Sequence, residues 1–409
     1  MNRAALLSFT SKARLLEHVA HSPTLASLWA QSDKPEQLNC LRSLPLAIRS
    51  KQQVDADMAA ANIGAPRVAI KFRLGWAYAQ ELGRFYKHGL TAVWQNFKET
   101  RHLCKSGYKH TGVLGRSGAD TAVMVPSFNE LSKAMAQQVY MRAVEDKAHR
   151  DATRGGVVRR EDKSSLSLIG QLALALTRSL FNLTRAEFQL LRRTPADFMR
   201  LPLFAVIAMV FMEVTPLVCY AFPEVTPLAC VLPSILPRVW PSKNRLAVQK
   251  AVHAEMVNES ADDFAMKTAY SIPPKTLRAL AQCLRLKSKY IPTAMFPDFI
   301  LRKRLHSHFL YLLVDNFYLG GLNGNGNLWD LVPQELVLAC LERNLVQDSK
   351  ALADTTAKGT AAEQKLAMDD LRLKLALFIA NFESCNVGYL AVDHLLPDVE
   401  TEAVMRWRA

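Results

Sequence analysis

The apolar run at residues 201–222 constrains this chain more than any other part of its sequence. Its 22 residues, LPLFAVIAMVFMEVTPLVCYAF, contain only three ionisable side chains, those of Glu213, Cys219 and Tyr220. A helix of this length would measure about 33 Å, close to the ~30 Å thickness of the hydrocarbon core of a bilayer. The run therefore predicts a single helix that spans a membrane, and a buried core helix is the alternative.

The other segments predict an all-α protein with a soluble, multi-helix C-terminal domain. Apolar residues recur at helical spacing between residues 65 and 103, and no segment shows the sustained alternation of a strand. Thr184 and Glu187 predict a capping box at the start of a helix, and Pro195 predicts a break in it. Pro274 and Pro333 stand where helix starts are expected. Further helices are expected near residues 246–258, 274–286, 296–319, 333–345, 362–383 and 386–394.

The N-terminal stretch resembles a mitochondrial presequence. It carries Arg3, Lys12 and Arg14 among apolar and hydroxylated residues, and it has no acidic residue before Glu17. An ordinary amphipathic first helix is the alternative. The expected organisation is a targeting segment at residues 1–30, a helical region at 65–163 with a loop at 105–126, a membrane region at 164–243, and a helical domain at 244–409.

The positive charge of the chain lies in its first half. Residues 1–200 hold 30 Lys and Arg against 16 Asp and Glu, whereas residues 201–409 hold 21 of each, so the net charge of +14 precedes the apolar run. A basic half of this kind favours an anionic partner, either membrane lipids or RNA, although a solvated surface produces the same statistics.

Nothing in the sequence indicates a conventional enzyme, a cofactor or a metal site. The seven cysteines never form a C-x-x-C pair, which favours free thiols. The phosphate-binding, nucleophile-elbow and metalloprotease motifs are missing. His306 and His308 are two positions apart, so on a helix they would point to different faces. We therefore predict no catalytic residues and no cofactor.

Glu213 and Pro216 are the candidate residues of an ion or proton pathway. A carboxylate near the bilayer centre costs on the order of 3 kcal/mol, so Glu213 should be protonated, paired or facing a wet cavity. Pro216 would free the carbonyl of Met212 beside it. A hydrogen bond from Glu213 to a neighbouring helix explains the same residue, and ordinary kinking explains the proline. Because one span cannot enclose a pathway, transport of a monovalent or divalent cation would need a homo-oligomer or a partner.

Two groups of charged residues are candidate contact surfaces. One group would bind ribosomal RNA phosphates or would simply be a solvated helix face. The other precedes the apolar run and would anchor the chain at the membrane interface or hold acidic headgroups, with Arg193 meeting Asp197 at i, i+4 spacing. The RNA-binding candidates are Lys275, Arg278, Arg285, Lys287, Lys289, Arg302, Lys303 and Arg304, and the interface candidates are Arg192, Arg193, Asp197 and Arg200.

A series of short motifs, taken in order, carries a family resemblance. In the first half of the chain they lie at residues 86–98 (YKHGLTAVWQNFK), at 183–194 (LTRAEFQLLRRT) with Asp197, at Met212-Glu213 and at Thr215-Pro216-Leu217. In the second half they lie at 277–284, 302–305, 315–316, 319–321, 334–336 and 339–343. Over about residues 70 to 400 this combination resembles the mitochondrial LETM family, the leucine zipper, EF-hand-containing transmembrane proteins.

The resemblance implies an inner-membrane protein with one span and a ribosome-binding-like domain in the matrix. It implies association with the mitochondrial ribosome, support for membrane-associated translation and protein insertion, and a role in ion homeostasis. The alternative it implies is a cation/proton exchanger, for K⁺ or Ca²⁺, or an essential subunit of one. The five arginines between residues 178 and 200 would by the positive-inside rule put the N-terminal side in the matrix, and we follow the family instead.

Two departures from the family pattern are visible. Asn323, Asn325 and Asn327 alternate with glycines but supply no carboxylates, so no EF-hand loop is present and calcium sensing by that route is not expected. The C-terminus also has no long coiled coil. The chain therefore resembles a short member of the family.

Overall fold

The fold is taken from a computed structural model of the chain. It describes residues 35–46, 67–106, 108–109, 122–123, 127–140, 183–210, 225–233, 235–239, 243–257, 259–287, 291–292, 295–321, 327–382 and 385–393. Most of these residues are helical, which confirms the prediction of an all-α protein. One two-residue hairpin falls within the predicted loop at 105–126, where β1 (Tyr108–Lys109) pairs with β2 (Ala122–Val123) in antiparallel register.

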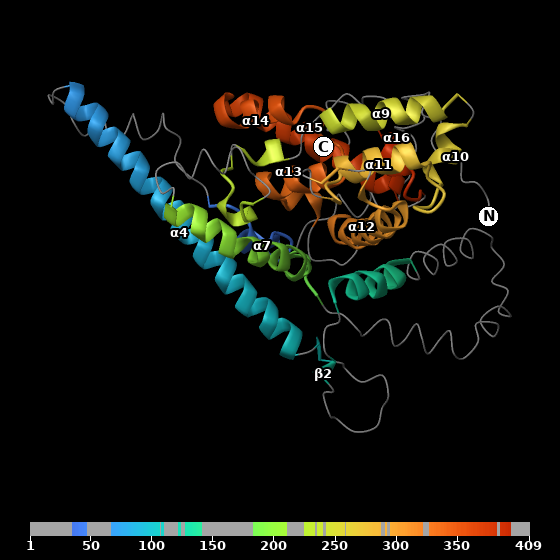
Figure 1. The fold of residues 1–409 in the computed structure, drawn as a ribbon, viewed down its shortest axis with the longest axis horizontal. Helices are drawn as coiled ribbons and strands as arrows, with labels where there is room; N and C mark the ends of the chain where they lie inside the picture. Colours follow the sequence, from blue (N-terminus) through green and yellow to red (C-terminus); the bar gives the residue numbers. More distant parts are fainter. Residues whose placement is uncertain are drawn as a thin grey trace, which may run out of the picture.

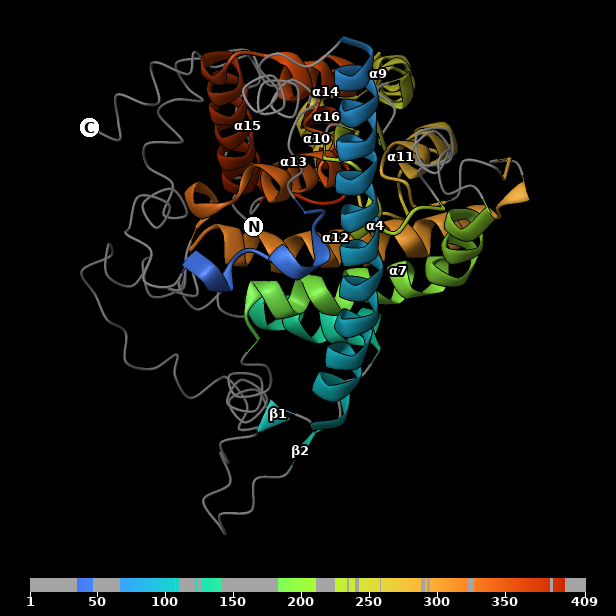
Figure 2. The same ribbon diagram turned by 90° about the vertical axis from the view of Figure 1, so that its left-hand side faces the viewer.

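The helices form a body with one long helix on its outside (Figures 1 and 2). The long helix is α4, and Figure 2 shows it in front of the body, crossing α7. The helices are α4 (Arg67–Ser106), α7 (Arg185–Val210), α9 (Lys243–Glu255), α10 (Ala261–Ala265), α11 (Pro274–Cys283), α12 (Asp298–Leu319), α13 (Pro333–Glu342), α14 (Ser349–Lys358), α15 (Ala361–Phe382) and α16 (Tyr389–Val392). Residues 128–140 form a further helix. The short 3-10 turns are η1 (Pro35–Gln37), η2 (Leu41–Ser43), η4 (Leu228–Cys230), η5 (Leu236–Val239) and η7 (Leu328–Asp330).

Helix α7 begins as its sequence predicts and then continues where a break was expected. The Thr184 and Glu187 side chains cap each other's backbone N–H groups, so the predicted capping box is confirmed. The predicted break at Pro195 is wrong, because the helix runs through both Pro195 and Pro202 to Val210. A proline inside a helix costs roughly 3 kcal/mol. Buried contacts of Arg193 and Asp197, on either side of Pro195, hold the helix together at this point.

The core of the body forms around α12, most of whose carboxyl half is buried. Leu301, Leu305, Leu312 and Leu319 of α12 are fully buried in one cluster to which α9, α11, α13, α15 and α16 contribute. Pro274 and Pro333 lie at the first positions of α11 and α13, as predicted. Two short helices were not predicted, α10 and α14. Their amino-terminal caps are Ser260 and Asp348, whose side chains accept backbone hydrogen bonds.

Helix α4 is joined to α7 and η4 by a small cluster of its own. Phe85 and Tyr86 pack against Phe204 of α7 and Cys230 of η4. A Cβ atom built at Gly89 would lie 2.7 Å from the Cys230 sulfur and 2.9 Å from the Ala229 carbonyl oxygen, so the close approach of α4 to η4 requires glycine. This contact fixes the long helix against the end of α7.

Among the described residues, no helix is both long enough and apolar enough to cross a membrane. The first ten residues of the predicted span belong to α7, and residues 211–222 lie outside the described residues. The predicted targeting segment at residues 1–30 also lies outside them.

Candidate functional site

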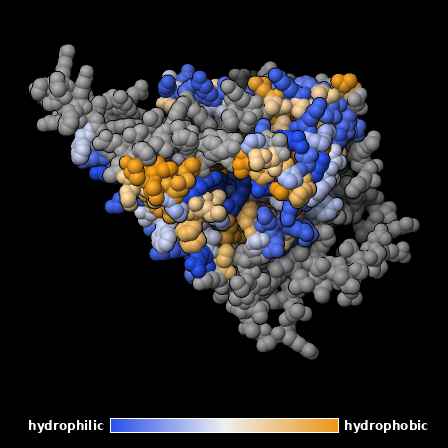
Figure 3. Space-filling view, viewed as in Figure 1, coloured by the Kyte–Doolittle hydropathy of each residue, from blue (hydrophilic) through white to orange (hydrophobic). Residues whose placement is uncertain are grey.

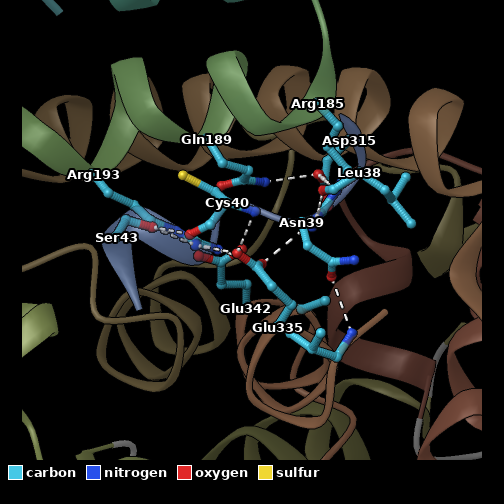
Figure 4. Close-up of polar contacts among 12 residues, drawn as sticks. Leu38, Asn39, Cys40, Ser43, Arg185, Gln189, Arg193, Asp315, Glu335 and Glu342 are labelled. Atoms are coloured by element: carbon cyan, nitrogen blue, oxygen red, sulfur yellow. Dashed lines mark hydrogen bonds and ion pairs between the residues drawn. The ribbon is translucent and has the colours of Figure 1, made fainter. Parts of the chain in front are cut away.

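Helices α7, α12 and α13 bring seven charged side chains together inside the body. Arg185, Arg193, Asp315, Glu335 and Glu342 are labelled in Figure 4. Burying charges is unfavourable unless each one is paired and hydrogen-bonded. The seven are Arg185, Arg192 and Arg193 of α7, Asp315 of α12, Glu335 and Glu342 of α13, and Arg343 directly after α13. Four guanidinium groups thus meet three carboxylates, and we call this set the ion network.

Glu335 is the centre of one half of the ion network. Arg193 donates to both of its oxygens, with 2.6 Å from Nη1 to Oε1 and 2.9 Å from Nη2 to Oε2. Arg185 Nη1 lies 3.5 Å from Oε2. Burial by itself would raise the pKa of the Glu335 carboxyl, but the charge and hydrogen bonds of Arg193, with the charge of Arg185, lower it below its usual value. Glu335 is therefore ionised in the folded protein.

Asp315 is the centre of the other half. It accepts hydrogen bonds from Arg185 Nε at 2.8 Å, Gln189 Nε2 at 2.7 Å and Arg343 Nη2 at 2.7 Å. Burial works to raise the pKa of Asp315, yet the charges of Arg185 and Arg343 and their hydrogen bonds outweigh it and hold that pKa well below its usual value. Arg185 contacts both carboxylates, so the two halves form one unit.

At one edge of the ion network, Arg192 packs on the aromatic ring of Tyr311. The Arg192 guanidinium lies 3.3 Å from the centroid of the Tyr311 ring and 2.8 Å from Glu342 Oε1, and the Tyr311 hydroxyl donates to Glu342 at 2.6 Å. His308 lies beside them, with Nε2 2.9 Å from the Glu342 carbonyl oxygen. Burial and then the charge of Arg192 lower the pKa of His308 to about 4, so it is neutral at physiological pH.

The segment at residues 38–43 closes the network from the N-terminal side. The Leu38 carbonyl accepts from Arg185 at 2.9 Å, the Cys40 N–H donates to Glu335 at 3.3 Å, and the Ser43 hydroxyl accepts from Arg193 at 3.0 Å. The Asn39 side chain donates to the carbonyl of Asp330, the last residue of η7, and accepts from the Val332 N–H just after it. We call residues 38–43 the strap. The ion network thus joins the strap, α7, α12 and α13. Each of its charged groups is paired with a group of opposite charge from the protein, which suits a structural role.

The predicted membrane-interface residues lie in the ion network or beside it. Arg192 and Arg193 belong to the network, and Asp197 is buried, accepting from the Leu228 N–H at 2.9 Å and from Arg200 at 3.3 Å. Arg193 was predicted to meet Asp197 at i, i+4 spacing, and its hydrogen bonds go to Glu335 instead. Burial raises the pKa of Asp197 to about 6, against the hydrogen bond from Leu228 and the charges of Arg200 and Arg193.

The predicted RNA-binding residues on and around α11 and α12 differ in their contacts: some bond to other groups of the protein, and others are exposed. Lys287 is buried and donates to the Ile291 carbonyl, Arg302 donates to the Ala269 and Tyr270 carbonyls, and Arg304 donates to the Leu286 carbonyl. Arg278 pairs with Asp298 at 3.1 Å. Lys275 and Lys303 are exposed, Arg285 is partly buried in the turn after α11, and Lys289 lies outside the described residues.

The predicted ion pathway falls on residues that the structure does not describe. Glu213 and Pro216 both lie in the range 211–224. Cation/proton exchange therefore stays a prediction from the sequence. Within the described part of the chain, no group of three or more His, Cys, Asp or Glu side chains could hold a metal ion.

The carboxyl half of α7 exposes an apolar stripe. Figure 3 shows a hydrophobic cluster over this end of α7, beside α4. The exposed fractions are 82% for Met199, 55% for Leu203, 60% for Val206, 79% for Met209 and 66% for Val210. Four of them, at positions 199, 203, 206 and 210, recur every three or four residues, so they lie on one face of the helix. The stripe runs directly toward residues 211–222.

A comparison with known protein families identifies the family of the chain. The family model of the pentamidine resistance factor domain matches residues 38–319. The chain belongs to this family. The match begins at Leu38, the first residue of the strap, and ends at Leu319, the last residue of α12. The ion network thus ties the family domain to α13, which follows it. No curated protein and no solved structure matches the chain.

Sequence reasoning missed the ion network, although one signal for it was present. Arg185, Gln189 and Arg193 recur every four residues in α7, so they share a face of the helix that also carries the fully buried Phe188 beside them. Polar side chains on a face that packs inside a protein need partners of opposite charge. That pattern identifies α7 as one side of a buried ionic joint, but it does not identify Asp315 or Glu335 as the partners.

Proposed function

We propose that this chain is a mitochondrial inner-membrane protein that binds the mitochondrial ribosome and supports membrane-associated translation, protein insertion and ion homeostasis. The observation that carries the proposal is the exposed apolar stripe of α7, most of which belongs to the first ten residues of the 22-residue apolar run. Isolated exposed apolar residues are common on proteins, but a contiguous apolar patch marks a contact with a membrane or partner.

The ion network fixes the orientation of the helix that carries the stripe. Arg185, Gln189 and Arg193 fix the amino-terminal half of α7 inside the body, while the carboxyl half exposes the stripe. Because buried ion pairs hold one half of α7 against α12 and α13, a membrane contact of its other half would fix how these two helices are oriented relative to the membrane. The helical domain would then face the matrix at a fixed angle, where a ribosome could bind it.

The ribosomal part of the proposal rests on the family resemblance and on the exposed basic residues of α11 and α12. Lys275 and Lys303 are exposed, and each carries a charge that could contact RNA phosphates. Arg302 and Arg304 bind backbone carbonyls within the protein, so changing them would test stability together with binding. The two lysines are therefore the better probes.

The anchor is tested by the double substitution Leu203→Lys with Val206→Lys in the full chain. Both side chains are already exposed, so the folded body should keep its stability. A charge inside the bilayer costs up to about 3 kcal/mol, so membrane retention should fall. The measurement is resistance to alkaline carbonate extraction from mitochondrial membranes. Leu246→Lys with Leu366→Lys, also exposed at 58% and 71%, is the matched control and should stay in the membrane. Complete extraction of the wild-type chain would overturn the proposal.

Ribosome binding is tested with Lys275→Glu and Lys303→Glu together. The wild-type chain should co-sediment with mitochondrial ribosomes at low salt and dissociate as salt rises, because phosphate contacts release counterions. The double variant should be retained several-fold less. Lys250→Glu with Lys350→Glu changes two exposed lysines of α9 and α14 by the same total charge and should bind as wild type does. Equal retention of both variants would remove this face from the proposal.

A further inference from the structure

Helix α4 presents to the outside a face that carries two groups of basic residues, one toward each end of the face. Arg84, Lys87, Lys98 and Arg101 are exposed, and His88 and His102 lie among them. With Thr91, Trp94 and Gln95 they recur at intervals of three and four residues, so they share one side of the helix. The buried residues Phe85, Gly89, Val93, Asn96 and Thr100 occupy the opposite side, against α7, η2 and η4. Figure 2 shows this helix on the outer surface of the body.

Within the described part of the chain, acidic residues pair with this face at its Arg84 end and leave its other cations unpaired with carboxylates. None of the positions 84, 87, 88, 91, 94, 95, 98, 101 and 102 carries a carboxylate. Glu99 points to the side, where it pairs with Arg42 of η2. Glu81 lies 3.7 Å from Arg84, whose side chain is 74% exposed. The face therefore attracts an anionic surface along several turns.

Aromatic rings connect the basic face to the apolar stripe of α7. Trp94 is 47% exposed, and Lys98 Nζ lies 5.6 Å from its ring centroid. Phe97 stacks on Phe198 of α7 with 3.7 Å between the ring centroids, and Trp94 lies 6.0 Å from the same ring. Met199, the most exposed residue of the stripe, follows Phe198 in the chain. Basic, aromatic and apolar side chains thus follow one another across the two helices.

We propose that this face of α4 binds the phosphate groups of anionic phospholipids at the membrane that receives α7. The inference rests on the proposed membrane anchor and adds a second contact with a defined lipid charge. Lys and Arg beside Trp are the usual residues of a membrane interface, and an adjoining apolar stripe inserts between acyl chains. Single-stranded RNA also binds basic and aromatic residues, but it offers no partner for Met199, Leu203 and Val206.

The test uses the full-length chain reconstituted in phosphatidylcholine vesicles that contain phosphatidylglycerol. One of the two lipids carries brominated acyl chains, which quench nearby indoles, and the difference between wild type and Trp94→Phe isolates the signal of Trp94. Brominated phosphatidylglycerol should quench Trp94 more than brominated phosphatidylcholine at equal mole fraction. A basic residue near an anionic surface contributes roughly fivefold in binding, so the preference should fall in high salt.

Charge reversal at the four exposed residues Arg84, Lys87, Lys98 and Arg101 should abolish the preference for phosphatidylglycerol. The matched control reverses Lys250, Lys350, Lys358 and Lys365, which are exposed on α9, α14 and α15, and should keep it. Both variants should stay resistant to alkaline carbonate, which separates this face from the anchor. Equal quenching by the two lipids in the wild-type chain would overturn the inference. Loss of binding to a single-stranded RNA in the fourfold variant, with lipid quenching unchanged, would assign the face to nucleic acid instead.

Discussion

Arg193 of α7 and Glu335 of α13 form a two-pronged ion pair in the interior of the protein, although 142 positions separate them in the chain. The fork of the guanidinium group matches the two carboxylate oxygens, which makes the pair both directional and strong. The Cys40 N–H and Arg185 also contact Glu335, so this one carboxylate links three segments of the chain, namely the strap, α7 and α13.

We expect Glu335→Gln to destabilise the protein by about 3–5 kcal/mol, because it leaves Arg193 and part of Arg185 as buried charges without a full partner. Chemical denaturation monitored by circular dichroism measures the change. Asp370→Asn is the matched control, since Asp370 and Lys374 form a partly exposed pair at 2.9 Å on α15 and should contribute less than about 1 kcal/mol. Equal effects of the two substitutions would contradict the structural role assigned to Glu335.

Asp197→Asn should change the pH dependence of stability. The folded pKa of Asp197 is about 6 against an ordinary value of 3.8, so the folded state binds the extra proton. The contribution of this group is therefore most favourable below about pH 4, and it is lost as the pH rises through 6. Asparagine removes this loss, so the variant should gain on the order of 1–3 kcal/mol relative to wild type between pH 4 and pH 7.

The measurement is the difference in unfolding free energy between the Asp197→Asn variant and wild type at several pH values. Taking the difference cancels His308, whose lowered pKa acts in the opposite direction over the same range. A difference that does not change with pH would show that the Asp197 carboxyl is not held out of water.

Two glycines of α4 should respond to alanine with opposite signs. At Gly83 nothing lies within 4 Å of the added Cβ, so Gly83→Ala should stabilise the helix by about 0.5–1 kcal/mol. At Gly89 the added atom meets Cys230 and the Ala229 carbonyl, so Gly89→Ala should destabilise by about 1–3 kcal/mol and loosen α4 from η4. Thermal melts of the two variants, compared with wild type, test the pair, and a stabilising Gly89→Ala would refute the close contact.

Asn39→Ala should release the strap locally. The substitution removes the bonds to the Asp330 carbonyl and the Val332 N–H, which costs about 1–3 kcal/mol for the buried groups left behind. Amide hydrogen exchange should therefore accelerate at Val332 while the amides of α15 stay protected. Thr91→Ala, which removes an exposed side-chain hydrogen bond on α4, should change neither. Unchanged exchange at Val332 in Asn39→Ala would argue against the strap.

The local signals in the sequence predicted local structure well. The capping box at Thr184 and the prolines at 274 and 333 stand where helices begin, because capping and proline geometry act within one turn. Pro195 misled the prediction because tertiary contacts around it outweigh the local cost of a proline in a helix.

The contacts of the charged residues could not be predicted in the same way. Arg193 has a possible partner four residues away in Asp197, yet it binds Glu335 far along the chain. The spacing of α7 shows which side chains share a face, but only the packing of α12 and α13 against it selects their partners. The basic face of α4 is different, since its spacing and its charges are both visible in the sequence once the helix is known to be continuous.

The strap also has a consequence for how the protein is made. In a chain that is synthesised from its amino end, residues 38–43 emerge early, yet Glu335, which binds the Cys40 N–H, follows 295 positions later. Contacts of such long range form slowly, and partly synthesised chains expose apolar segments that aggregate. The strap can therefore be fixed only after Glu335 has been synthesised, so residues 38–43 wait for most of the chain before they find their partner.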